Sequence, residues 1–229
     1  MNERQQQLLK LVVEEYIQSA EPVASVSLVA AADLDWSGAT VRNELRALEE
    51  AGYLTHPHTS AGRIPTDLGY QFYIRELMSK TAAGKKIRSA CAHDLESTKD
   101  TGVATKALAK TISEYLGSAV LVVFPAGSLY YTGIGNLFSQ PEFRNYEIAL
   151  SVSAMLDDCE ARLPQIMAQL KNDSATVLIG NDNPLGGTCS FVVGSSGEGS
   201  LFGILGPVRM DYRSAIGAID LIKEMMKDD

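Results

Sequence analysis

The chain has 229 residues, 45% of them hydrophobic and 21% charged, a composition typical of one or two globular domains. The formal net charge of −8 excludes a coat of positive charge for nonspecific polyanion binding, so any contact with nucleic acid depends on a few well-placed cations. The most apolar run, 119–124, is far too short to cross a bilayer, and the polar N-terminus lacks the features of a secretory signal.

The first part of the chain predicts three helices. Apolar residues recur at helical spacing over 3–20, and a second helix over 25–32 is rich in alanine and valine and is expected to be mostly buried. Ser37 is positioned to cap a third helix that runs to about residue 51. On that helix Val41, Leu45 and Leu48 share one face, and polar residues occupy the other.

A hairpin and a fourth helix are expected next. Two short β-prone runs, 53–56 and 63–65, flank a turn, which predicts two antiparallel strands. Thr66 can cap a helix over 67–80. That helix would pack through three residues, namely Leu68, Phe72 and Leu77. Residues 1–80 therefore form the first predicted domain.

The remaining chain predicts a linker and a second domain. Residues 81–113 are small, basic and threonine-rich, which favours a linker with helical stretches. From residue 114 to residue 229 short apolar strands alternate with helices, so we expect an α+β domain. The strands are expected near 119–124, 175–180, 188–194 and 200–206, and the helices near 142–171 and 211–227.

A short helix, a turn, a longer helix with a polar outer face and a basic hairpin together predict a winged helix-turn-helix. Asn43 suits a contact with adenine, and Arg42 or Arg46 suits guanine or a phosphate. Arg63 and its neighbours in the hairpin would touch phosphates or the minor groove. The expected DNA-binding residues are Ser37, Thr40, Arg42, Asn43, Arg46, His58, Thr59, Ser60 and Arg63.

Other functions have weaker support in the sequence. The glycine-rich segments of the second half follow neither the GxGxxG nor the GxxxxGK[ST] phosphate-binding pattern. No catalytic triad can be argued, since all three histidines lie at or before position 93. We therefore expect no enzyme activity. A winged helix used only for protein contacts stays open, as does a ligand sensor whose pocket would be lined by Tyr130, Tyr131 and Phe191.

Three cysteines, Cys91, Cys159 and Cys189, are odd in number and widely spaced, which matches neither a disulfide framework nor a zinc pattern. A reducing compartment fits them best. We expect a cytoplasmic protein with no metal, no other cofactor and no membrane segment.

Several segments of the chain match the motifs of one protein family. The most specific is the run from His56 to Thr66, HPHTSAGRIPT, and the run from Ala39 to Glu44, ATVRNE, also matches. Toward the C-terminus, three further matches are NLFSQPEF from Asn136, IGNDNP from Ile179 and ILGPVRMDY from Ile204. The first two runs resemble the N-terminal domain of the HrcA heat-inducible transcription repressors, and the other three resemble that family's GAF-like domain. The resemblance implies a repressor that binds an inverted-repeat operator of chaperone genes as a dimer, with the chaperonin as a partner.

The chain departs from the family in two places. Val26 stands where the family usually has a basic residue, and Ala24 replaces a glycine, which affects one expected phosphate contact. The family also carries an inserted dimerisation domain, whereas here only four residues, 125–128, join Phe124 to Leu129. We expect a truncated GAF-like domain that forms the homodimer in place of the insert.

Overall fold

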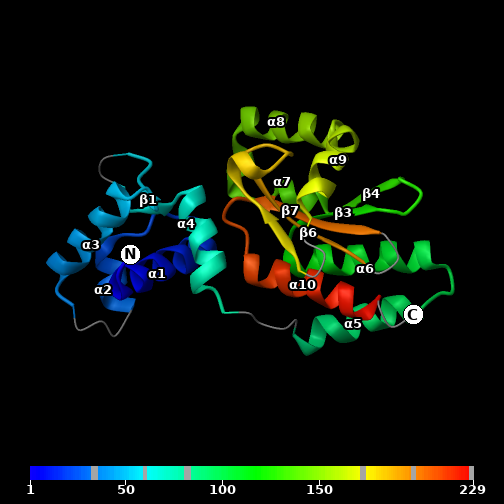
Figure 1. The fold of residues 1–229 in the computed structure, drawn as a ribbon, viewed down its shortest axis with the longest axis horizontal. Helices are drawn as coiled ribbons and strands as arrows, with labels where there is room; N and C mark the ends of the chain where they lie inside the picture. Colours follow the sequence, from blue (N-terminus) through cyan, green and yellow to red (C-terminus); the bar gives the residue numbers. More distant parts are fainter. Residues whose placement is uncertain (32–35, 59–60, 80–83, 171–173, 197–199, 227–229) are drawn as a thin grey trace. The chain divides into compact units, whose positions relative to one another are not determined.

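The computed structural model of the chain describes residues 1–31, 36–58, 61–79, 84–170, 174–196 and 200–226 (Figure 1). Its helices and antiparallel sheets confirm the predicted α+β class. The chain divides into two compact units, Met1–Ser79 and Lys80–Asp229.

The first unit begins with three helices, α1 (Glu3–Ser19), α2 (Ser25–Ala31) and α3 (Gly38–Glu50). Asn2 caps α1, because its side chain accepts from the Gln5 backbone at 2.9 Å while the Gln5 side chain accepts from the Asn2 backbone at 3.1 Å. The buried stripe of α1 consists of Leu8, Leu9, Val12 and Val13. Helix α1 packs against α3, so the amphipathic pattern of both helices forms one core.

Helix α2 differs from the expectation that it is mostly buried. Leu28 is buried, but Val26 is 75% exposed. A single short helix can turn only one face to the core, so the valine on its other face reaches solvent.

The predicted hairpin consists of β1 (Leu54–Thr55) and β2 (Ile64–Pro65), paired antiparallel with Leu54 opposite Pro65. Val23 extends this pairing, since its N–H and C=O bond to the carbonyl and N–H of Arg63 at 2.9 and 2.8 Å. The close approach requires Gly62, because a Cβ there would lie 2.5 Å from the Val23 carbonyl.

The fourth helix consists of α4 (Asp67–Phe72) and the π-helical turn η1 (Tyr73–Leu77). Thr66 caps it as predicted, accepting from the Gly69 N–H at 3.1 Å and donating to the Gly52 carbonyl at 2.6 Å. The prediction that Leu68 packs inward is wrong, because Leu68 is 46% exposed and the buried side contains Gly69, Tyr70 and Tyr73. Gly69 lies against the Tyr53 carbonyl, and this contact fixes the rotation of the helix.

The second unit is built on a five-stranded antiparallel sheet in the order β4-β3-β7-β6-β5. Its strands are β3 (Ala119–Val123), β4 (Leu129–Thr132), β5 (Thr176–Leu178), β6 (Cys189–Ser195) and β7 (Leu201–Pro207). Strand β4 is an edge strand of four half-buried residues, so the sequence gives only a weak signal for it.

Helices cover both faces of this sheet (Figure 1). Helices α6 (Thr101–Leu116) and α10 (Tyr212–Met225) lie on one face, with α5 (Lys85–Glu96) packed on α6. On the other face lie α7 (Ile134–Phe138), α8 (Tyr146–Asp157) and α9 (Cys159–Gln169). Two short 3-10 turns, η2 (Pro141–Arg144) and η3 (Gly180–Asp182), complete the unit.

The segment predicted as a linker, 81–113, lies within the second unit. It forms α5 and most of α6, and α6 buries Ala104, Leu108 and Ile112. The small residues that favoured a linker instead allow α6 to pack closely on α5 and β3.

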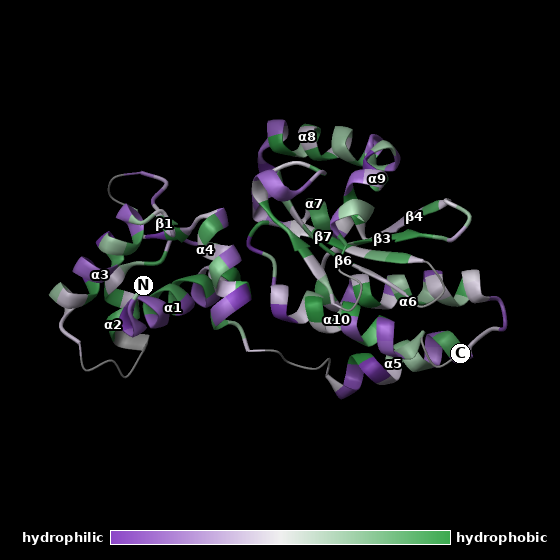
Figure 2. Cartoon of the chain, viewed as in Figure 1, coloured by the Kyte–Doolittle hydropathy of each residue, from purple (hydrophilic) through white to green (hydrophobic). Residues whose placement is uncertain are grey.

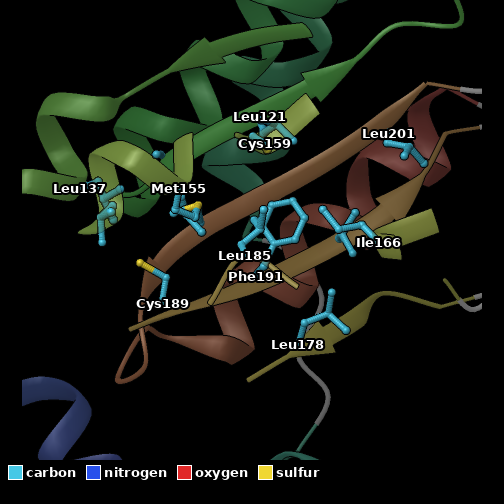
Figure 3. Close-up of a cluster of buried hydrophobic side chains, with 14 of the residues drawn as sticks. Leu121, Leu137, Met155, Cys159, Ile166, Leu178, Leu185, Cys189, Phe191 and Leu201 are labelled. Carbon is cyan, nitrogen blue, oxygen red and sulfur yellow. The ribbon is translucent and has the colours of Figure 1, made fainter. Parts of the chain in front are cut away.

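The core beneath α7 to α9 combines alternate residues of the strands with residues of these helices (Figure 3). Phe191 and Leu185 lie side by side at the centre of this core (Figure 3). The strands β3 and β7 are among the hydrophobic segments of Figure 2. Gly203 makes room for Phe191, since a Cβ at that position would lie 2.0 Å from the aromatic ring. This contact explains a glycine in the middle of a buried strand.

Polar residues of the NLFSQPEF and ILGPVRMDY segments join α7 and η2 to neighbouring elements. Asn136 donates to the Ser113 carbonyl of α6 at 3.2 Å. Arg209 forms an ion pair with Glu142 and donates to Gln140 at 3.0 Å. Gln140 in turn donates to the Gly117 carbonyl at 3.1 Å. The polar residues of these two segments therefore connect α7 and η2 to α6 and to the segment after β7.

Candidate nucleic-acid interface

Helix α3 presents a polar outer face above a buried stripe. Ser37 caps the helix by accepting from the Thr40 N–H at 3.2 Å. Val41, Leu45 and Leu48 are at most 3% exposed, which anchors the helix. The predicted DNA-contacting residues Arg42, Asn43 and Arg46 are all exposed.

A surface groove of about 420 Å³ brings four of the nine predicted site residues together. Arg42, Asn43 and Arg46 line it from α3, and Arg63 lines it from the position just before β2. The segment 23–25, which precedes and begins α2, forms another wall. One concave surface thus carries polar and cationic groups from the helix and from the base of the hairpin.

The three arginines of this groove differ in their partners. Arg46 pairs with Glu50 one turn along the helix, at 2.9 Å, and both side chains are mostly exposed. Arg63 pairs with Glu49 at 2.8 Å, and only about a quarter of each side chain is exposed. Arg42 forms no ion pair with any described residue. Its charge is therefore the most available for an anionic ligand.

Glu49 has a structural role that was not predicted from the sequence. Its carboxylate forms an ion pair with Arg63 and a hydrogen bond with Nδ1 of His56, which flanks β1. These contacts tie the last turn of α3 to both strands of the hairpin. A signal was available in the sequence, because His56 and Arg63, the two partners of Glu49, both lie in the HPHTSAGRIPT run that resembles the family.

The turn of the hairpin is described only in part. His58 is exposed, whereas the predicted site residues Thr59 and Ser60 lie outside the described residues. A cation–π contact near α3 was not predicted from the sequence. In it, the Arg4 guanidinium lies 5.7 Å from the centre of the Trp36 ring.

The second unit offers little space for a ligand at the aromatic residues considered in the sequence. Tyr131 and Phe191 line a cavity of only about 10 Å³ beneath the sheet, enough for at most one water molecule. Burial raises the pKa of Tyr131 far above its usual value, with a smaller contribution from Cys159. Both observations describe a closed apolar core.

The three cysteines are all buried and free. Desolvation raises the pKa of Cys91 to about 11 and that of Cys189 to about 12, and it also raises the pKa of Cys159. Within the described ranges, no three His, Cys, Asp or Glu side chains are grouped so that they could hold a metal ion. No helix in those ranges is long and apolar enough to span a membrane.

Comparison with known proteins finds similar transcription repressors. A heat-inducible transcription repressor HrcA of Chloroflexus aurantiacus is 57% identical over 81 residues, which cover 35% of this chain and 22% of that protein. The corresponding repressor of Bifidobacterium longum is 39% identical over 123 residues, covering 54% of this chain and 33% of that protein. The matched region thus spans about a fifth to a third of these relatives.

A solved structure shares the fold. The crystal structure of a hypothetical protein at 2.2 Å resolution superposes with a TM-score of 0.72, 18% identity, and coverage of 100% of this chain and 98% of the other. The profile described as HrcA protein C terminal domain matches residues 72–216, more than half of the chain. The chain therefore belongs to the HrcA family.

Proposed function

We propose that this protein is a heat-inducible transcription repressor that binds operator DNA through α3 and the hairpin of its first unit. The observation that carries the proposal is the groove that joins exposed Arg42, Asn43 and Arg46 to Arg63. Membership of the HrcA family and the names of its relatives support the same function.

In this proposal the first unit is a winged helix-turn-helix, with α2 and α3 as its helix pair and the hairpin as its wing. Helix α3 enters the major groove, where Asn43 reads adenine and Arg42 reads guanine. Thr40 and Ser37, at the start of α3, approach the same bases or the adjoining phosphates. His58, Thr59 and Ser60 of the wing contact the DNA backbone.

Arg63 takes a different role from the one expected from sequence. Because its guanidinium is paired with Glu49 and only 27% of its side chain is exposed, it holds the wing in place against α3. A direct phosphate contact requires that pair to open. Arg42 is therefore the main reading residue and Arg63 a positioning residue.

The second unit is proposed to be a truncated GAF-like domain that supports a homodimer on an inverted-repeat operator. A cytoplasmic location and regulation by the chaperonin follow from the family and are part of this proposal. No catalytic activity and no cofactor are required by it.

Operator binding by the full chain tests the proposal, with DNA from upstream of the organism's own chaperone operons. Arg42→Ala should weaken binding by about 1–3 kcal/mol, since a base-reading contact is lost. Arg75→Ala is the matched control, because Arg75 is an exposed arginine of the same unit that is paired with Glu76 outside the groove. Equal affinity of both variants and the parent would favour a winged helix that serves protein contacts.

A further inference from the structure

Helix α8 carries an exposed apolar face that no described residue of its own unit covers. Tyr146 is 77% exposed and Leu150 is 57% exposed, the largest exposed apolar side chains on this helix. Tyr146, Leu150, Ala154 and Asp157 share one face at helical spacing, while Val152 and Met155 face the core. In Figure 2 the middle of α8 is green to white between purple ends.

We propose that a second copy of this chain covers this face, with the two α8 helices packed antiparallel about a two-fold axis at Leu150. The inference rests on the proposed function to the extent that an inverted-repeat operator needs a two-fold protein. It goes further by assigning the interface to one helix and its register to one residue.

The register is fixed by size complementarity. Tyr146 and Ala154 each lie four residues from Leu150, about 6 Å along the helix axis in opposite directions. An antiparallel pair centred on Leu150 therefore sets the large Tyr146 of each copy against the small Ala154 of the other. Leu150 then meets Leu150 of the second copy at the axis.

The charges at the two ends of α8 fit the same register. Arg144 lies in η2, two residues before the N-terminal end of α8, and Asp157 is the last residue of α8, about 10.5 Å from Leu150 along the axis. Antiparallel packing therefore brings Arg144 of each copy close to Asp157 of the other. Both residues are exposed, and neither forms an ion pair with a described residue of its own chain.

The helix pair is short, and this limits the strength of the dimer. Helix α8 has 12 residues and is about 18 Å long, so the pair buries less than the roughly 800 Å² per partner of a standard interface. We therefore expect a reversible monomer–dimer equilibrium in solution. Two half-sites on one operator would strengthen it by holding the copies at high effective concentration.

Sedimentation equilibrium of the full chain without DNA tests the interface separately from DNA binding. Leu150→Glu places two like charges at the axis and should raise the dimer dissociation constant at least about tenfold. Val103→Glu is the matched control, because Val103 is 54% exposed on α6, across the sheet from α8, and this variant should dimerise like the parent. Circular dichroism should show both variants folded.

A charge exchange tests the register. Arg144→Glu and Asp157→Arg should each weaken the dimer, and the double variant should restore the parental dissociation constant. The inference would be overturned if the parent is monomeric, or if Leu150→Glu leaves the dimer dissociation constant unchanged. It would also be overturned if Val103→Glu raises that constant as much as Leu150→Glu does, or if the double charge variant dimerises as weakly as the single variants. Binding of Leu150→Glu to a single half-site remains a separate test of the proposed function.

Discussion

Arg63 of the hairpin and Glu49 of α3 form an ion pair at 2.8 Å that joins the two parts of the candidate interface, the helix α3 and the hairpin. Only 27% and 22% of the two side chains are exposed, so water screens this pair less than the surface pairs of the chain. The last turn of α3 and the start of β2 are thereby held at a fixed distance.

Glu49→Gln should destabilise the first unit by about 1–2 kcal/mol, because Arg63 and His56 lose a charged acceptor in a partly buried site. Urea unfolding followed by the fluorescence of Trp36, the single tryptophan of the chain, reports this unit. Glu50→Gln is the control, since the Arg46–Glu50 pair is mostly exposed and should contribute less than about 0.5 kcal/mol. Equal losses in the two variants would contradict the role given to Glu49.

Gly62→Ala should destabilise the same unit by about 1–3 kcal/mol, because the added methyl group displaces the Val23 backbone from its bridge to Arg63. The same fluorescence assay measures the effect. At Gly38, in the first turn of α3, a Cβ would meet nothing closer than 3.6 Å, so Gly38→Ala should be neutral or slightly stabilising. The account fails if Gly62→Ala is as stable as Gly38→Ala.

Val26→Lys should tighten operator binding. Val26 is 75% exposed and, with Arg42, lines a hollow between α2 and α3, where the family usually has a basic residue. One added phosphate contact should steepen the dependence of log affinity on log salt by about 0.9. Fluorescence anisotropy at several salt concentrations measures this slope, and Val26→Gln, which adds no charge, should leave it unchanged. An unaltered slope for the lysine variant would place Val26 away from the DNA.

The cysteines should react slowly with a thiol reagent at pH 8 in the folded protein and react fully after denaturation. The raised pKa values of Cys91 and Cys189, about 11 and 12, keep both thiols protonated at that pH. Because these pKa values lie above the unfolded value of 9.0, the stability they contribute is present below pH 9 and is lost as the pH rises through the folded values. Rapid labelling of the native chain would show that the thiols are accessible.

The first unit was well predicted from sequence because its signals are local. Only nearby residues are needed to predict the amphipathic helices α1 and α3, the capping residues Ser37 and Thr66, and the β-prone runs around the turn. The exposure of Leu68 could not be predicted, because it follows from the contact between Gly69 and the Tyr53 carbonyl.

The second unit was harder to predict because tertiary packing decides its elements. The small residues of α6 suggested a linker, yet they are buried between α5 and the sheet. Strand β4 depends on its pairing with β3, in which Tyr131 lies opposite Leu121. At the candidate site, the sequence identified the exposed cations. It could not show that Arg63 is paired with Glu49, or that Arg42 forms no ion pair with an acidic residue in the described ranges.

Sequence-specific DNA recognition by α3 is tested most directly by the ratio of the affinities for operator DNA and for a scrambled duplex. Anisotropy titrations of the full chain at physiological salt should give an operator affinity at least about 10³-fold higher than that for the scrambled duplex. The affinity for both duplexes should fall as salt increases. Equal affinity for the two duplexes, or no binding to either, would contradict sequence-specific recognition.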